Sequence, residues 1–458
     1  MASSSTISPK NLIELLQRHL HSFVTPGDRL ALALSGGVDS VALLDILTKL
    51  STAIGFHLSA VHVNHGISQN TDQWSHFCQE LCKEFAIPLS IFRVQINKQA
   101  QQSLEAAARD ARYQAFTRVD TDYIVLAQHQ DDQAETLLLQ LLRGAGIKGL
   151  SAMPTVRLLA GTSIKLLRPL LNVPRTALLH YAQINNLSWV NDESNTNTDF
   201  DRNYLRHQVL PVIEVRYSAY RKTLSRACRH LGEAVQLLDE LAQADSAQVI
   251  NRDTLSLKKL CNLNPARAKN LLRYFLAQKM SYLPSTAKMD ELLRQLCAIT
   301  SDNHFSFQFE NIEIRCFRGT IECLPIKSTT EKHFIIPWQG EKQLFIEPLQ
   351  GMLVFTKQSG TGIDLQKLSR QAVTIRSRSG GEKFQLNTAR PRRSLKKIFQ
   401  EAALPPWERN TLPLLFCADT LIWVAGIGID CHFQAPPDAP GLKVTWLPNT
   451  LSFNLLNT

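Results

Sequence analysis

The residues with the clearest chemical capacity form a short glycine-rich string near the start of the chain. The apolar run Ala31–Leu34 is typical of a buried strand, and Ser35-Gly36-Gly37-Val38-Asp39-Ser40 follows it directly. Paired glycines let the backbone approach an anion, and the free N–H groups at the start of the next helix attract negative charge. The string therefore predicts a phosphate cradle in which Ser35 and Ser40 add hydroxyl donors.

Asp39 places a carboxylate beside the expected phosphates. It would repel a nucleotide unless a divalent cation lay between them, so we expect Asp39 to bind Mg²⁺ and to take part in catalysis. The competing interpretation is an ordinary strand-to-helix turn in which Asp39 caps the helix. Val63 lies at the end of the next predicted strand, where the backbone either reads an adenine edge or is simply buried.

The string Ser35–Ser40 resembles the pyrophosphatase-loop signature of enzymes that activate a carbonyl as its adenylate. This resemblance implies cleavage of ATP to AMP and pyrophosphate, and the lysine of the loop that transfers a γ-phosphate is absent. Further strings resemble, in order and spacing, those of the lysidine synthase family. They cover most of residues 29–215 and are His62–Gly66, Glu105–Tyr113, His129–Thr136, Arg143–Gly146, Arg168–Leu171, Asn191–Asn195 and Arg202–Arg206. Near the other end, Arg378–Glu382, Leu395–Gln400 and Pro406–Arg409 resemble that family's second C-terminal domain.

The resemblance implies one reaction in particular. Enzymes of this family adenylate the wobble cytidine in the CAU anticodon of tRNA(Ile) and ligate free L-lysine onto it. The product is lysidine, which changes codon reading from AUG to AUA, and ATP and Mg²⁺ are the implied cofactors. The residues expected to bind ATP are Ser35, Gly36, Gly37, Val38, Asp39, Ser40 and Val63.

Three acidic residues crowd the first turn of a predicted helix. Asp132 and Glu135 are three residues apart, so they share a face, and their mutual repulsion favours a cation as complement. Free lysine carries two ammonium groups, and a nearby carboxylate could accept the side-chain proton before attack. We therefore expect Asp132 and Glu135 to bind lysine, with Asp132 also catalytic. Capping of the helix or Mg²⁺ binding is the alternative, above all for Asp131, which we expect to be a metal ligand with Asp39.

Basic side chains complete the expected site. Arg109 and Arg112 are three residues apart on one predicted helix and can face the same pocket, where Arg112 is expected to be catalytic. An ordinary solvated helix face is the alternative for Arg109 and Arg112, and surface salt bridges are the alternative for Arg202 and Arg206. The residues expected to contact tRNA or the nucleotide are Arg109, Arg143, Arg202, Arg206, Arg392, Arg393, Lys396 and Lys397.

One position departs from the family pattern. Most relatives carry a histidine immediately before His129, whereas this chain has Gln128. Glutamine donates hydrogen bonds but cannot shuttle a proton, so no role of that histidine is carried over. His129 itself either has a chemical role or is a structural group near a strand end.

The pattern of elements indicates how these residues are brought together. Apolar runs and amphipathic stretches alternate from Arg29 to about Leu170, which is typical of a doubly wound parallel α/β sheet with its ligands at the carboxyl ends of the strands. The predicted strands are Leu30–Leu34, Leu58–Val63, Leu89–Val94 and Tyr123–Ala127. The predicted helices are Ser40–Leu50, Thr71–Phe85, Ser103–Val119 and Asp132–Arg143.

The remaining chain predicts two further domains. A helix-rich stretch runs from about Tyr217 to Cys297, and short strands such as Leu344–Phe355, Val373–Arg378 and Leu421–Ile427 follow from Phe305 onward. We expect a Rossmann-like ATP-pyrophosphatase catalytic domain over 1–215, a helical tRNA-binding domain over 216–330, and a small β-rich, tRNA-docking domain over 331–458. Between Leu365 and Arg409, eleven Lys or Arg stand against three Glu, a local charge of +8.

The bulk composition is compatible with this assignment. A net charge of +10 favours a polyanionic partner, although it could serve only solubility. Met1–Lys10 is a Ser-rich polar tail without a secretory apolar run, and no stretch predicts a membrane span, so we expect a cytoplasmic protein. The nine scattered cysteines are interpreted as reduced, mostly buried thiols. The sequence leaves a homodimer open.

Two other functions compete. A tRNA thiolation enzyme would use the same ATP loop, but it normally needs a Cys-x-x-Cys pair, which this chain lacks. A noncatalytic RNA-binding protein could keep the nucleotide domain for structure. The acidic residues Asp39, Asp131, Asp132 and Glu135 argue against this, since crowded like charges are destabilising without a ligand.

Overall fold

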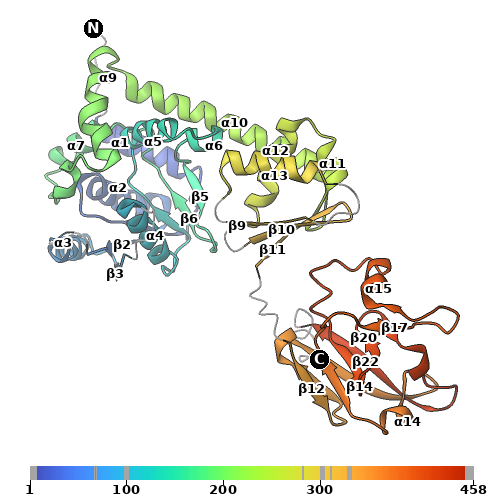
Figure 1. Cartoon of the computed structure of the whole chain (residues 1–458). Coiled ribbons are helices and arrows are strands. Elements are labelled where there is room, and N and C mark those ends of the chain that lie inside the picture. Colours follow the sequence, from blue (N-terminus) through green and yellow to red (C-terminus); the bar gives the residue numbers. More distant parts are fainter. Residues whose placement is uncertain are drawn as a thin grey trace. The chain divides into compact units, whose positions relative to one another are not determined.

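The computed structural model describes residues 8–66, 68, 70–96, 103–280, 283–299, 305–309, 312–326 and 333–448 (Figure 1). The chain forms two compact units, one of residues 1–248 with 269–286 and one of residues 249–268 with 287–458. Each is described by itself. The division into 1–215, 216–330 and 331–458 stays a prediction.

A six-stranded sheet in the order β3-β2-β1-β4-β6-β5 organises the first unit. The neighbours of β1 are β2 on one side and β4 on the other, and both run parallel to it. Ligands of such sheets bind where the strand order reverses, at the carboxyl ends of the strands. The edge strand β5 is antiparallel to its neighbour. The strands are β1 Arg29–Ala33, β2 His57–Asn64, β3 Leu89–Arg93, β4 Tyr123–Val125, β5 Val156–Leu158 and β6 Lys165–Leu167.

Helices cover both faces of this sheet because alternate strand residues point to opposite sides. Leu30 and Leu32 of β1 pack among apolar residues of α1, α2 and α7. Ala31, between them, packs with Phe116 of α4 on the other face. The helices of this part are α1 Pro9–Leu20, α2 Val38–Ile54, α3 Thr71–Glu84, α4 Leu104–Phe116, α5 Gln130–Leu142, α6 Ile147–Leu150 and α7 Arg175–Ile184.

The sequence predictions for this domain are confirmed in class and order. All four predicted strands and all four predicted helices are present, with their ends shifted by a few residues. The predicted polar tail Met1–Lys10 is too long, because Ser8 caps a helix that begins at Pro9; residues 1–7 lie outside the described part of the chain. The sequence did not predict the short pair β5 and β6.

A helical stretch follows the sheet. It contains α8 Asp201–Tyr204, a π-helical turn Leu205–Val209, α9 Leu210–Arg216 and the long α10 Tyr220–Val249. The predicted helix-rich stretch up to Cys297 is interrupted by the hairpin β7 Ile250–Asn251 and β8 Thr254–Ser256. This hairpin joins β9 Phe305–Phe309, β10 Ile312–Phe317 and β11 Thr320–Pro325 in a five-stranded sheet. The other helices here are α11 Leu257–Cys261, α12 Pro265–Ala277 and α13 Thr286–Cys297.

A disulfide joins Cys261 at the end of α11 to Cys297 at the end of α13. The interpretation of all nine cysteines as reduced is therefore wrong at these two positions. The partners are 36 residues apart in sequence, and only the fold brings their Cα atoms to 5.7 Å. The other seven cysteines are thiols, and six of them are buried.

The C-terminal region is a β-sandwich. One sheet has the order β12-β16-β19-β20-β21 and the other β13-β14-β22-β15, and apolar residues of both meet in one core. The predicted single strand Leu344–Phe355 is instead a hairpin, because a turn at Glu347–Leu349 separates β13 from β14. The elements are β12 Ile335–Trp338, β13 Gln343–Ile346, β14 Gly351–Ser359, β15 Ile363–Asp364, α14 Leu365–Leu368, β16 Val373–Arg376, β17 Lys383–Phe384, β18 Arg393–Ser394, α15 Leu395–Glu401, β19 Leu414–Cys417, β20 Thr420–Val424, β21 Gly428–Ile429 and β22 Pro440–Pro448.

No helix in the described part of the chain is both long enough and apolar enough to cross a membrane.

Candidate nucleotide and substrate site

The phosphate turn lies between β1 and α2, at the reversal point of the sheet. Gly36 has φ +86°, and a Cβ built there would lie 2.8 Å from the side chain of Val190. Its carbonyl also accepts a hydrogen bond of 3.0 Å from the N–H of Val190. Gly37 precedes α2 and supplies no side-chain cap, so the N–H groups of the first helical turn remain open to an anion. The close approach and positive φ at Gly36 require glycine, and Gly37 leaves the helix start uncovered.

Two serine hydroxyls line the same turn. Ser40 Oγ donates to the carbonyl of Gly37 at 2.9 Å and lies 3.1 Å from Ser35 Oγ. Ser35 is exposed, whereas Ser40 is buried at the base of the turn. The predicted ATP residues Ser35, Gly36, Gly37, Val38, Asp39 and Ser40 therefore form one continuous segment, and Val63 lies in the neighbouring strand β2.

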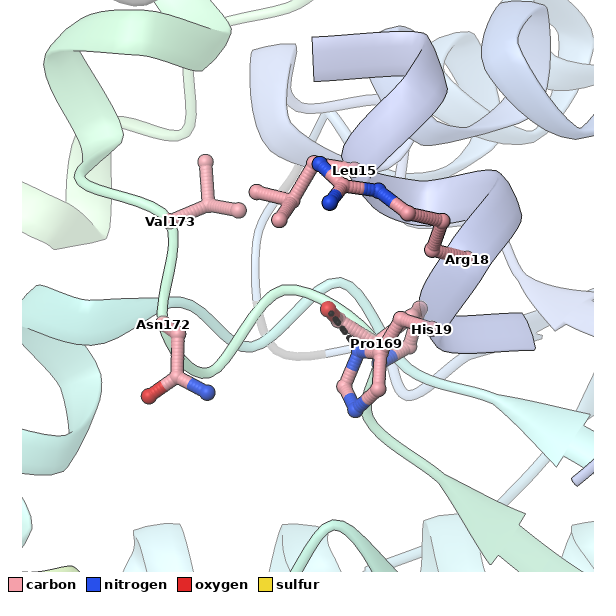
Figure 2. Close-up of a pocket in the computed structure, with 6 residues that line it drawn as sticks. All are labelled: Leu15, Arg18, His19, Pro169, Asn172 and Val173. Atoms are coloured by element: carbon pink, nitrogen blue, oxygen red, sulfur yellow. Dashed lines mark hydrogen bonds between the residues drawn. The ribbon is translucent and has the colours of Figure 1, made fainter. Parts of the chain in front are cut away.

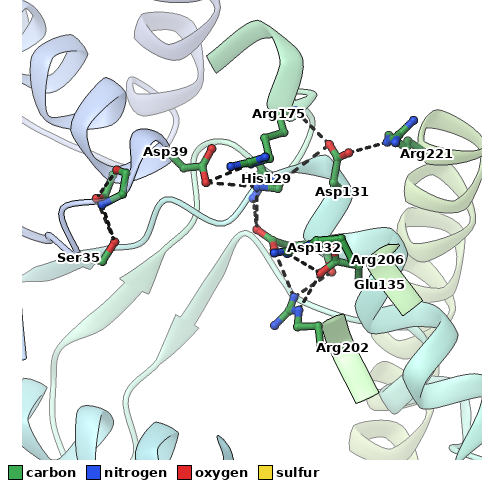
Figure 3. A network of polar contacts seen from close by, with 12 residues as sticks. Ser35, Asp39, His129, Asp131, Asp132, Glu135, Arg175, Arg202, Arg206 and Arg221 are labelled. Atoms are coloured by element: carbon green, nitrogen blue, oxygen red, sulfur yellow. Dashed lines mark hydrogen bonds and ion pairs between the residues drawn. The ribbon is translucent and has the colours of Figure 1, made fainter. Parts of the chain in front are cut away.

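A buried histidine sits among three carboxylates next to this turn (Figure 3). His129 Nε2 lies 3.7 Å from Asp39 and 3.5 Å from Asp132, and His129 Nδ1 lies 3.8 Å from Asp131. Burial alone lowers the pKa of His129, but the charges of Asp132, Asp39 and Asp131 outweigh it and leave the pKa raised. The sequence left the role of His129 open, and the fold places it at the centre of the acidic residues.

The two expected metal ligands, Asp39 and Asp131, differ in whether their carboxylate oxygens already accept hydrogen bonds. Asp39 Oδ1 is buried and has no hydrogen-bond partner among the described atoms, so it suits a cation or another ligand. Asp131, in contrast, accepts a hydrogen bond of 3.0 Å from the N–H of Arg175 and one of 2.5 Å from Arg221 Nε. Of the pair, Asp39 is the better candidate for Mg²⁺.

Glu135 is held by two arginines (Figure 3). Its side chain is 1% exposed, and its carboxylate accepts from Arg202 Nε at 2.8 Å and from Arg206 Nε at 2.7 Å. Asp132 is farther from the same two guanidinium groups, at 3.4 and 3.5 Å. Glu135, which was expected to bind lysine, therefore forms ion pairs with Arg202 and Arg206, which were expected to contact tRNA. The two arginines lie 67 and 71 positions beyond Glu135, and no local pattern signals the pairing.

Two further arginines at the site were not predicted. Arg175 begins α7, and its Nε lies 3.5 Å from Asp39. A cation in the first turn of a helix is electrostatically unfavourable, so its position is a signal that could have found it. Arg221 of α10 contacts Asp131 and also Glu214, and these acids raise its pKa despite the opposing effect of burial.

The other predicted basic residues of this domain lie outside the acidic cluster formed by Asp39, Asp131, Asp132 and Glu135. Arg109 and Arg112 extend from α4, and burial followed by the charge of Arg109 lowers the pKa of Arg112. Arg143 pairs with Asp201 at 3.1 Å on the surface. Gln128, in place of the family's histidine, accepts a hydrogen bond from Arg168 Nε.

The basic segment of the sandwich contains both paired and solvent-facing cations. Arg392 donates to the fully buried Asp430 at 2.8 Å, and Arg393 pairs with Glu401. Lys396 and Lys397 on α15 are exposed. Phe399 on the same helix is buried in the core of the domain.

A pocket between α1 and the segment that joins β6 to α7 holds none of these residues (Figure 2). It is lined by Leu15, Arg18, His19, Pro169, Asn172 and Val173. His19 Nδ1 lies 3.0 Å from the carbonyl of Pro169, which ties α1 to the segment between β6 and α7. This contact therefore stabilises the segment between β6 and α7.

Comparisons with known proteins decide the family. Residues 9–213 match a PP-loop domain, residues 255–322 a TilS substrate binding domain and residues 373–446 a TilS substrate C-terminal domain. A tRNA(Ile)-lysidine synthase of Nitrosomonas europaea is 59% identical over 453 residues, which cover 99% of each chain. This chain belongs to the tRNA(Ile)-lysidine synthase family. A relative of the same name from Coxiella burnetii is 35% identical over 96% of this chain and 97% of its own.

Membership in the lysidine synthase family confirms the resemblance read from the motifs. The whole acidic cluster and the phosphate turn lie within the PP-loop match, so this domain uses ATP. The disulfide partners Cys261 and Cys297 lie within the substrate-binding match.

Proposed function

We propose that the protein is an ATP-dependent ligase that joins free L-lysine to the wobble cytidine of the CAU anticodon of tRNA(Ile). The cytidine is first adenylated, pyrophosphate leaves, and the lysine side-chain amine then displaces AMP to give lysidine. The observation that carries this proposal is the juxtaposition of the phosphate turn with the cluster of Asp39, His129 and Asp132. A nucleotide held at the turn would bring its phosphates next to carboxylates that can serve a cation and an amine.

The adenylation step uses the phosphate turn between β1 and α2. The N–H groups at the start of α2 and the exposed hydroxyl of Ser35 hold phosphate oxygens, and the free oxygen of Asp39 belongs to the same helix start. The buried hydroxyl of Ser40 donates to the carbonyl of Gly37 and so stabilises the turn itself. Mg²⁺, when bound at Asp39, would neutralise phosphate charge. Arg112 is the candidate to stabilise the adenylated cytidine, because a guanidinium forms bidentate contacts with phosphate.

The ligation step needs a neutral amine. The side-chain amine of free lysine has a pKa of about 10.4, so a base must take its proton before attack. Asp132 is 14% exposed against 1% for Glu135, and its arginine contacts are the longer ones. Asp132 is therefore the first contact for the incoming ammonium. Glu135 acts beside it by binding lysine in exchange for one of its arginines.

The test is pyrophosphate release from ATP, with tRNA and lysine each supplied or withheld. We expect a single round of release with tRNA alone and continued turnover only when lysine is added. Continued turnover that depends on a sulfur donor in place of lysine would support the thiolation enzyme instead. Release that is independent of tRNA would contradict both.

Cytoplasmic location, and a homodimer as an alternative to a monomer, remain predictions from the sequence. Native mass spectrometry of the purified chain decides the second.

A further inference from the structure

A second charged cluster surrounds Tyr113 on α4. The guanidinium carbons of Arg109 and Arg157 each lie 5.5 Å from the centre of the tyrosine ring. Arg168, which follows β6, lies near enough for its charge to lower the pKa of Tyr113. Three cations from α4, β5 and the end of β6 thus converge on one aromatic ring.

Arg168 is the unusual member. Its side chain is buried, with 2% exposure, and its hydrogen-bond partners are neutral: the side chain of Gln128 and the carbonyl of Pro154 at 2.9 Å. A buried charge is normally matched by an opposite charge, because its desolvation is costly. Within the described residues, no ion pair joins Arg109, Arg157 or Arg168 to a carboxylate.

The positive charge of this cluster shifts the pKa values of neighbouring side chains. Burial alone raises the pKa of Tyr113, yet Arg109, Arg168 and Arg157 together leave that pKa lowered. The neighbouring Arg112 has a lowered pKa, for which burial is the largest cause and the charge of Arg109 another. Glu105, one turn before Arg109, is the acid whose charge reaches Arg112. The balance around the ring is strongly positive.

The cluster is also close to the reacting groups. Gln128 contacts Arg168 directly and precedes His129, which lies among Asp39, Asp131 and Asp132. Arg109 and Arg157 are exposed, so a ligand can reach the cluster from solvent. An anion bound at Arg168 would lie at the carboxyl end of β6, on the same edge of the sheet as the phosphate turn.

We propose that Arg109, Arg157 and Arg168 around Tyr113 form a second phosphate-binding site, which holds a backbone phosphodiester of the substrate RNA near the modified base. The inference rests on the proposed function for the identity of the RNA. The shared chemistry is a phosphate group, and ATP is the other source from which it could come. Guanidinium groups suit either source, since they bind phosphate in a bidentate manner.

The experiment compares Arg157→Gln with Arg118→Gln in the full-length protein. Both residues are exposed, both substitutions remove one positive charge from the same domain, and Arg118 lies just beyond α4 outside the cluster. Binding of unmodified tRNA is measured over a range of salt concentrations, and binding of ATP with Mg²⁺ is measured without RNA.

We expect Arg157→Gln to weaken tRNA binding about tenfold, as for the removal of one charged hydrogen bond. The salt dependence should fall by about 0.7 to 0.9 of a log unit per log unit, the value of one phosphate contact. ATP binding should be unchanged, and Arg118→Gln should leave both affinities near those of the parent. Weaker ATP binding with unchanged tRNA binding would overturn the RNA assignment and give the site to ATP. Unchanged affinity for both would overturn the site altogether.

A second readout does not depend on turnover or on the RNA. Inorganic phosphate should raise the apparent pKa of one tyrosine, followed by the ultraviolet absorbance of its phenolate, because phosphate neutralises the cations around Tyr113. Chloride at matched ionic strength is the control, and the phosphate effect should vanish in Tyr113→Phe. A phosphate effect that persists in Tyr113→Phe contradicts the site. Lysine-dependent pyrophosphate release by the unsubstituted protein, measured alongside, separates a failure of this inference from a failure of the proposed function.

Discussion

The acidic cluster of the first unit and the basic segment of the sandwich show the same division between charges that are already paired and charges that are available. In the first, Glu135 is enclosed by Arg202 and Arg206, while Asp39 keeps one oxygen without a partner among the described atoms. In the second, Arg392 is bound to a buried aspartate, while Lys396 and Lys397 face solvent. Residue type alone does not separate a ligand contact from a structural ion pair, whereas burial and partner do.

The largest effect is expected at the free carboxylate. Asp39→Asn keeps the shape of the side chain but removes the charge that would hold Mg²⁺ beside the phosphates. We expect adenylation of tRNA to slow by about 10²-fold or more, as for removal of one preorganised electrostatic contact. The melting temperature should change little. If Asp39→Asn formed AMP at the rate of the parent protein at an ordinary Mg²⁺ concentration, Asp39 would have no catalytic role.

The enclosed carboxylate should respond in stability as well as activity. Glu135→Gln leaves Arg202 and Arg206 without their main partner, and breaking a buried ion pair costs about 3 kcal/mol. Urea unfolding measures this destabilisation, and a higher lysine requirement for turnover tests the ligand role. Asp201→Asn, which removes the exposed partner of Arg143, is the matched control and should change stability little. Full stability together with unchanged lysine dependence would contradict both roles.

The exposed lysines of the sandwich should affect RNA binding without affecting the fold. We expect Lys396→Ala with Lys397→Ala to weaken tRNA binding several-fold and to lower its salt dependence by about 0.7 to 0.9 of a log unit for each phosphate that the two lysines bind. Lys357→Ala with Lys443→Ala is the control, since both residues are exposed on β14 and β22 of the same domain. Equal effects of the two pairs would mean that only net charge matters. Arg392→Ala, in contrast, should destabilise the fold by leaving Asp430 buried and unpaired.

The smallest effect concerns pH. The pKa of His129 is raised in the folded protein, so its ion pairs stabilise fully below the unfolded pKa of about 6.5. This contribution disappears as the pH rises through the higher folded pKa. The stability difference between the parent and His129→Gln should therefore shrink from about pH 6 toward alkaline pH. A difference that is constant or grows with pH would show that His129 is neutral at this site.

Local patterns predict what local chemistry determines. The phosphate turn follows from Gly36 and Gly37 at the end of an apolar run, and the parallel sheet follows from the alternation of elements. The helix α1 was not predicted although its signal is present, since Ser8 caps it, Pro9 begins it and its buried leucines share one face. The hairpin of β13 and β14 was predicted as one strand although its turn, Glu347–Leu349, contains Pro348, which is a signal against a continuous strand.

Pairings across long separations cannot be read from the sequence. Glu135 and Arg202 both belong to strong motifs, but only the fold shows that they neutralise each other. The same holds for Cys261 and Cys297, whose surrounding residues resemble those of any helix end. Arg168 is recognisable in sequence only as part of a motif, and its burial without a carboxylate is visible solely in three dimensions.

The hydrogen bond from Val190 to the carbonyl of Gly36 has a thermodynamic consequence. Val190 lies on the segment that leads to Arg202 and Arg206, so the phosphate turn and the arginine-bearing helices are joined through a short stretch of backbone. If RNA binding shifts that segment, the affinity for ATP changes by some factor, and linkage requires ATP to change the affinity for RNA by the same factor. The order in which ATP and RNA are added then affects their binding rates. The coupling free energy between the ATP and RNA sites has the same value whichever substrate binds first.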